Sequence, residues 1–136
     1  HAHTDGKDIA VFLGSAQTDP MAQQRALNGE YRVVYCTPEK LTFAGGSFLN
    51  DLGRMHRRGQ QHKSASSGGG NHNGICLVAV DESHCVSEWG HDFRPPYRSI
   101  GNELRSHPIL RDIPILALTA TAMPRVQSDI ISSLHM

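Results

Sequence analysis

The chain has 136 residues, of which 38% are apolar, and its 13 basic and 13 acidic side chains give no formal net charge. This length fits one domain at most, and any surface for nucleic acid must be local because the overall charge is zero. No run of 18 apolar residues occurs, which excludes a membrane-spanning helix, and we expect no membrane partner. The three cysteines form no C-x-x-C pair, so we expect a reducing environment and no dedicated zinc site.

Apolar and helical segments alternate along the first part of the chain. Residues 9–13 form a short apolar run that predicts a buried strand, and a helical stretch begins after Pro20. A second strand is predicted at 32–36, and a second helix from Glu39 towards Leu52.

Residues 53–74 then change in composition. They hold six glycines, three serines, four basic residues and no acid. This composition predicts a flexible insertion between a first part, residues 1–52, and the remainder, residues 75–136. The functional alternative is a basic arm that touches phosphate.

In residues 75–136, predicted strands and helices alternate again. The continuous apolar run at 75–80 predicts a strand buried on both faces. A helix at 97–106, a strand at 115–118 and a helix from Pro124 follow, and the last helix would present one apolar face formed by Val126, Ile130, Ile131 and Leu134. The alternation predicts an α/β fold in which helices flank a parallel sheet.

Two adjacent carboxylates, Asp81 and Glu82, directly follow the strand at 75–80. Ligands of open α/β sheets bind beyond the carboxyl ends of the strands, and paired carboxylates there suit Mg²⁺ that carries a nucleotide's phosphates. The structural alternative is that the two acids lie at the N-terminus of a helix, where they interact favourably with the helix dipole. A third interpretation is an unrelated metal-dependent hydrolase that uses Asp81, Glu82 and His84.

An aromatic segment, residues 85–97, comes next and contains the only tryptophan of the chain. Bases stack on exposed aromatic rings, and a neighbouring arginine adds charge, so Trp89, Phe93 and Arg94 suit single-stranded nucleic acid. The alternative is that both rings seal the loop onto the core. Further along, Thr119 and Thr121 either relay hydrogen bonds between loops or cap the last helix.

Taken together, these segments resemble the RecQ family of DNA helicases. DESH at 81–84 looks like the family's Walker B motif, with Ser83 where alanine is usual, and CVSEWGHDFRPPY at 85–97 is similar to its aromatic-rich loop. The weaker matches are LTATA at 118–122 to motif III, TPEKL at 37–41 to motif Ib, and FLGSAQ at 12–17 to the preceding segment of Werner-syndrome-like members.

The resemblance implies an ATP-dependent 3′–5′ DNA helicase of repair and recombination, which is nuclear and acts on single-stranded DNA and duplex junctions. Asp81 would hold Mg²⁺ through water, and Glu82 would be the general base for ATP hydrolysis. His84 would link the nucleotide site to the DNA path. The resemblance also implies that Thr119 and Thr121 of motif III link the nucleotide site to the DNA path. The residues that would sense single-stranded DNA are Trp89, His91, Phe93 and Arg94.

One departure from the family is large, because no G-x-x-x-x-G-K-S/T loop occurs and the only Gly-Lys pair, Gly6-Lys7, precedes Asp8. We therefore expect an incomplete RecA-like P-loop NTPase domain that lacks the Walker A strand and loop and depends on other helicase domains in cis. Such a piece would leave sheet edges open and would be inactive alone. The alternative is a nucleic-acid-binding or scaffolding module of a degenerate helicase without ATPase activity.

Overall fold

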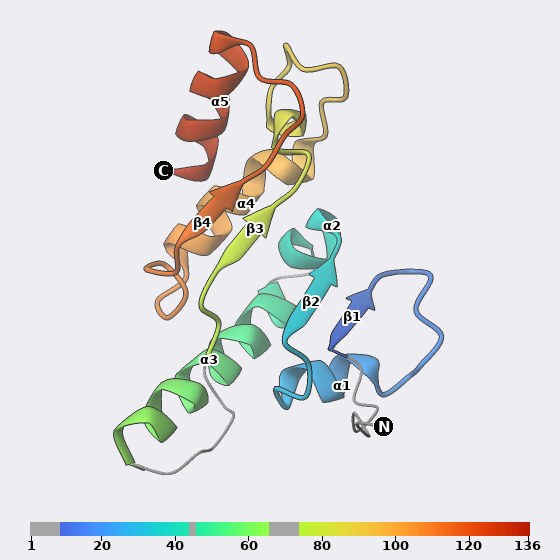
Figure 1. The fold of residues 1–136 in the computed structure, drawn as a ribbon, viewed down its shortest axis with the longest axis vertical. Helices are drawn as coiled ribbons and strands as arrows, with labels where there is room; N and C mark the ends of the chain where they lie inside the picture. Colours follow the sequence, from blue (N-terminus) through green and yellow to red (C-terminus); the bar gives the residue numbers. More distant parts are fainter. Residues whose placement is uncertain (1–8, 44–45, 66–73) are drawn as a thin grey trace, which may run out of the picture.

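The computed structural model of the chain describes residues 9–43, 46–65 and 74–136 (Figure 1). Short strands alternate with helices through these ranges, which confirms the predicted α/β fold. In chain order the elements are β1 (Ala10–Leu13), α1 (Ala22–Leu27), β2 (Val33–Cys36), α2 (Pro38–Thr42), α3 (Ser47–Ala65), β3 (Val78–Val80), the 3₁₀ turn η2 (Ser83–Val86), α4 (Pro95–Ser106), β4 (Ile115–Ala117) and α5 (Pro124–Leu134).

The strands form two separate parallel pairs. Ala10 of β1 lies opposite Val33 of β2, and Val78 of β3 lies opposite Ile115 of β4. Parallel strands need a crossover connection, which α1 supplies in the first pair and α4 in the second. Within the described ranges β2 and β3 do not pair, so each pair keeps an open edge, as expected for an incomplete sheet.

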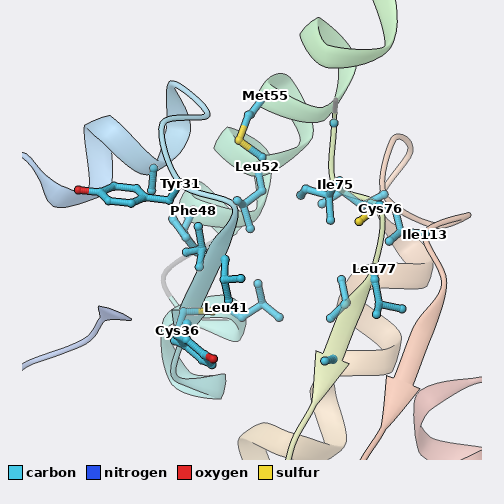
Figure 2. A pocket seen from close by; sticks show the side chains of 18 of the residues that line it. Tyr31, Cys36, Leu41, Phe48, Leu52, Met55, Ile75, Cys76, Leu77 and Ile113 are labelled. Atoms are coloured by element: carbon cyan, nitrogen blue, oxygen red, sulfur yellow. The ribbon is translucent and has the colours of Figure 1, made fainter. Parts of the chain in front are cut away.

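A cavity of about 1540 Å³ lies where these two edges approach each other. Figure 2 shows the apolar side chains that line it from both sides, among them Leu52 and Met55 of α3 and Ile75 and Leu77 of the segment before β3. The prediction that 75–80 is buried on both faces is therefore wrong, because only Val78–Val80 pairs with a neighbour and Leu77 is 44% exposed.

Helix α3 is longer than the sequence predicted. The helix expected from Glu39 to Leu52 is two helices, α2 and α3, and α3 continues to Ala65, so a flexible insertion over 53–65 is wrong; residues 66–73 lie outside the described ranges. Arginine, methionine, glutamine and lysine favour helix, and they outnumber the two glycines of this stretch. No helix of the described ranges, α3 included, has the length and hydropathy to cross a bilayer.

The basic residues of α3 contact the protein itself. Arg58 donates a hydrogen bond from Nη2 to the carbonyl oxygen of Leu27, with an N···O distance of 2.9 Å. Arg54 pairs with Asp51 one turn earlier on the helix. Two side chains considered for a phosphate-binding arm are thus engaged within the chain.

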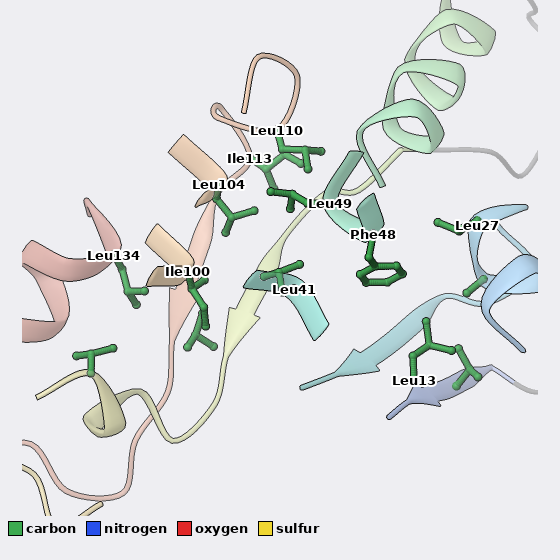
Figure 3. Packing of buried hydrophobic residues seen from close by; sticks show 14 of the residues in the cluster. Leu13, Leu27, Leu41, Phe48, Leu49, Ile100, Leu104, Leu110, Ile113 and Leu134 are labelled. Carbon is green, nitrogen blue, oxygen red and sulfur yellow. The ribbon is translucent and has the colours of Figure 1, made fainter. Parts of the chain in front are cut away.

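The buried apolar side chains form one cluster (Figure 3), and its fully buried members lie around α4 and α5. Three of the four residues expected on the apolar face of α5 are buried, whereas Ile131 is 53% exposed. The helices approach closely at Gly101 of α4, where a Cβ atom would overlap the carbonyl oxygen of Ser133. The largest fully buried side chains all belong to this part of the chain, namely Leu110, Leu134, Val86, Ser83 and Ser87.

Candidate functional site

The predicted site residues gather at the carboxyl ends of β3 and β4. Because these strands are parallel neighbours, the segments that follow them meet at one edge of the sheet. The carbonyl oxygen of Leu118 accepts hydrogen bonds from both the amide, at 2.8 Å, and the hydroxyl, at 2.9 Å, of Ser83. Ser83 is fully buried, so its hydroxyl adds a hydrogen bond, which alanine could not make, between the two segments.

Asp81 and Glu82 form an exposed pair at the tip of β3. The carboxylate of Asp81 accepts the amide N–H of Glu82 at 2.8 Å. Glu82 has a φ of 50°, a left-handed conformation that is uncommon for residues other than glycine. Such conformations are concentrated at functional sites, where the surrounding contacts compensate for their cost.

His84 joins the carboxylate pair to the segment after β4. Its Nδ1 lies 2.9 Å from Oγ1 of Thr119 and 3.4 Å from Oε2 of Glu82. The Thr119 hydroxyl donates its proton to the carbonyl of Thr121 at 3.1 Å, so the contact with His84 is satisfied when Nδ1 carries the proton. Thr119 thus relays hydrogen bonds, and neither threonine caps α5, whose N-cap residue is Met123.

The aromatic loop, residues 87–94, leaves Trp89 57% exposed, so the interpretation that this ring seals the loop onto the core is wrong. Phe93 is half-buried, and the guanidinium of Arg98 lies 5.0 Å from its ring centroid. The ring of His91 meets the ring of His84 edge-on, with 5.7 Å between centroids. Glycine is needed at Gly90 because a Cβ atom there would lie 2.6 Å from the carbonyl oxygen of His84.

An ion pair connects this loop to the first half of the chain. Arg94 donates from Nη2 to Oε1 of Glu39, and its guanidinium lies 5.4 Å from the ring centroid of Tyr97. A hydrogen bond from its own backbone amide, followed by the bond from Arg94, lowers the pKa of the Glu39 carboxyl. Sequence reasoning placed residues 37–41 in a motif but missed Glu39, although an acid directly after Thr-Pro at a helix start was a usable signal.

The thiol of Cys85, in the 3₁₀ turn before the loop, is buried. Burial raises the pKa of Cys85, and the nearby carboxylate of Asp92 adds to the rise. A thiol with a raised pKa remains protonated near neutral pH and is a poor nucleophile. The candidate chemistry therefore belongs to the carboxylates and the imidazole.

The donor set at Asp81 and Glu82 fits Mg²⁺ that arrives with phosphate oxygens. Carboxylate oxygens are hard ligands, and Mg²⁺ is commonly held by one or two of them together with water and substrate phosphates. No cluster of three potential metal-ligating side chains occurs in the described ranges, so this part of the chain offers no closed cage for a metal.

Comparison with known proteins gives a consistent result. A family model for DEAD/DEAH box helicases matches residues 3–130. The chain is 39% identical over 96% of its length to the ATP-dependent DNA helicase Q-like SIM of Arabidopsis thaliana and 42% identical over 93% to the bifunctional 3′-5′ exonuclease/ATP-dependent helicase WRN of Mus musculus. It is also 38% identical over 93% to the ATP-dependent DNA helicase RecQ of Bacillus subtilis. The chain spans 14%, 8% and 18% of these relatives, and the similarities confirm the resemblance seen in residues 81–97 and 118–122.

Proposed function

This chain belongs to the DEAD/DEAH box helicase family, and from that premise we propose that it forms part of the ATP-hydrolysing domain of a RecQ-type 3′–5′ DNA helicase. The other parts needed for hydrolysis, including a phosphate-binding loop, would come from elsewhere in the protein that carries this chain. The similarity to eukaryotic RecQ-type helicases also supports a nuclear protein of DNA repair and recombination.

The carboxylate pair provides the nucleotide chemistry of this proposal. Asp81 would hold Mg²⁺ through water, and the bound ion would neutralise charge on the triphosphate. Glu82 takes the proton of the attacking water as general base. The exposure of both residues and the left-handed turn at Glu82 support these roles, because the turn follows the strand end where substrates of α/β sheets bind.

The aromatic loop provides the DNA contact. Trp89 offers an exposed ring for base stacking, and base–aromatic stacking contributes about 1–3 kcal/mol per base. Arg94 and His91 add a guanidinium and an imidazole to the same loop, and Phe93 lies half-buried under Arg98. Single-stranded DNA and the single strand at a duplex junction are the partners that this loop suits.

The observation that carries the proposal is the contact chain through His84. This residue touches Glu82 on one side, Thr119 on another and His91 of the aromatic loop on a third. A change in the loop on DNA binding therefore moves a side chain that touches the proposed base. Coupling of DNA binding to ATP hydrolysis follows from this arrangement.

The test is Glu82→Gln in the protein that carries this chain, with ATP hydrolysis measured with and without single-stranded DNA. Loss of a general base is expected to lower the DNA-stimulated rate by about 10²–10⁴-fold while DNA binding is kept. The matched control is Glu103→Gln, the same change on a half-buried glutamate of α4, which should hydrolyse ATP as the wild type does.

Two results would contradict the proposal. Unchanged hydrolysis in Glu82→Gln would remove Glu82 as the base. A wild-type protein that binds single-stranded DNA but does not hydrolyse ATP would instead support the alternative, a binding or scaffolding module without ATPase activity.

A further inference from the structure

Arg125, the second residue of α5, covers the exposed ring of Trp89. Its guanidinium carbon lies 3.7 Å from the ring centroid. The other four cation–ring contacts found in the described ranges have separations of 4.9 to 5.4 Å. At 3.7 Å the guanidinium is in van der Waals contact with the indole, at the spacing of a stacked pair.

The same helix also fixes the backbone of the loop below that ring. The amide N–H of Trp89 donates to Oγ of Ser87 at 3.2 Å, and the Ser87 hydroxyl donates to Oδ2 of Asp129 at 2.6 Å. Ser87 is fully buried, and Asp129 lies one helical turn after Arg125. Two side chains of one face of α5 therefore hold Trp89, one through its backbone and one over its ring.

The charge of Arg125 has no carboxylate partner among the described residues. Arg94 of the loop and Arg98 of α4, by contrast, pair with Glu39 and Glu88. Arg125 is exposed, so its charge faces solvent beside an aromatic surface. A free guanidinium next to a ring is the pair of groups that a nucleotide engages, the phosphate with the cation and the base with the ring.

We propose that Arg125 occupies the base-stacking face of Trp89 in the DNA-free protein and exchanges with a base when single-stranded DNA binds. The base takes the indole face, and the displaced guanidinium binds the neighbouring phosphate. The inference rests on the proposed function and deepens it, because it makes α5, the helix that follows the Thr119 segment, a direct DNA contact. Arg125 is thereby a DNA-binding residue of the coupling apparatus and not only a support for the loop.

The first measurement is the salt dependence of binding to a fluorescein-labelled oligothymidylate, followed by anisotropy in the protein that carries this chain. Arg125→Ala removes one phosphate contact, so affinity should fall roughly tenfold and the slope of log K against log salt should become shallower by about 0.7. Arg125→Lys keeps a charge and should retain the wild-type slope. Arg111→Ala removes an exposed arginine that lies outside the site, so it should match the wild type.

The second measurement separates exchange from permanent stacking. Acrylamide quenching of Trp89 emission, taken as the difference from Trp89→Phe, should rise in DNA-free Arg125→Ala, because the ring face is open. With saturating oligothymidylate the excess should disappear, because a base covers the ring in both proteins.

The outcomes are distinguishable from failure of the proposed function. A wild type that neither binds oligothymidylate nor responds to it in ATP hydrolysis would end the proposed function itself. A responsive wild type with an unchanged salt slope in Arg125→Ala would overturn only the phosphate contact, and excess quenching that persists in the DNA complex would overturn the exchange. Either of these two results leaves Arg125 with a supporting role.

Discussion

The two parallel strand pairs share one architecture but differ in how tightly the elements around them pack. Around β3 and β4, α4 and α5 pack so closely that only glycine fits at Gly101, and fully buried serines anchor the loops that carry the site. Both pairs leave large side chains in solvent, with Phe12 of β1 and Leu116 of β4 each 43% exposed, but the largest fully buried side chains all lie in the second half. The open edges of β2 and β3 both face the cavity, and each of these strands is paired on its other side.

The candidate site lies in the half of the molecule whose elements pack more tightly. Proton transfer needs side chains held in a narrow geometry, and the His84 contacts lie in the well-packed half. The N-terminal half meets this half through the packing of α2 against α4, the Glu39–Arg94 ion pair and a contact between His107 and Asn50. Four predictions test this contrast, in order of decreasing effect.

The largest effect is expected from a cavity in the well-packed half. Leu134→Ala removes a fully buried side chain and should lower the free energy of unfolding by about 2–5 kcal/mol. Leu27→Ala removes a residue that already lines the open cavity, so its cost should lie near or below the lower end of this range. Urea unfolding measures the free energy of unfolding of both variants. Equal losses would contradict the expected difference between the two halves.

A smaller effect is expected from a glycine in each half. Gly101→Ala places a Cβ against the backbone carbonyl of Ser133, which cannot move without separating α4 from α5, so about 1–3 kcal/mol should be lost. Gly14→Ala meets only the end of the exposed Phe12 side chain, which can rotate away. Thermal unfolding should show a clear drop for Gly101→Ala and little for Gly14→Ala; the reverse order would contradict the packing described.

Sequence reasoning found the parts of this fold that depend on local pattern. The strand and helix positions follow from hydrophobic runs and breakers, and the clustering of Asp81, Glu82 and Thr119 follows from the rule that the carboxyl ends of parallel strands meet. The exposed Trp89 was one of two alternatives, because residue types alone do not settle burial. The extension of α3 was missed because the glycines and serines near residues 64–74 dominated the composition of the whole stretch.

The contacts that the sequence could not supply join residues far apart in the chain. Arg94 and Glu39 are 55 positions apart, and Ser87 and Asp129 are 42 apart. No periodicity or spacing rule relates such residues, because their meeting depends on how the helices pack across the sheet. The left-handed turn at Glu82 was missed for a similar reason, since glycine, the usual signal, is absent there.

A third prediction compares two threonine hydroxyls. Thr119→Val removes the partner of His84 and should lower DNA-stimulated ATP hydrolysis by up to roughly tenfold, the equivalent of one hydrogen bond. Thr42→Val removes a hydroxyl that only donates to the carbonyl of Pro38 within α2, so hydrolysis should be unchanged. Steady-state rates with saturating single-stranded DNA measure both. A wild-type rate in Thr119→Val, with its fold intact by circular dichroism, would show that His84 is positioned without this contact.

The smallest effect concerns the pH response of the contact between the halves. Nδ1 of His107 accepts the amides of Ile109 and Leu110 at 3.1 and 3.3 Å, and Nε2 faces Oδ1 of Asn50 at 3.3 Å. Burial lowers the pKa of His107, so the unfolded chain binds a proton more readily than the folded one. The contribution of His107 to the free energy of unfolding is therefore full above the ordinary histidine pKa of about 6.5. It declines as the pH falls through this value.

His107→Asn tests this assignment, because its side-chain oxygen can accept an amide without taking a proton. The variant should show a shallower loss of unfolding free energy between neutral and mildly acidic pH, whereas replacement of the exposed His135 by asparagine should leave the wild-type slope. A slope that is unchanged in His107→Asn would assign the acid sensitivity to another group. A shallower slope would assign part of the acid sensitivity to His107, since protonation of Nδ1 removes the acceptor that holds the chain after α4.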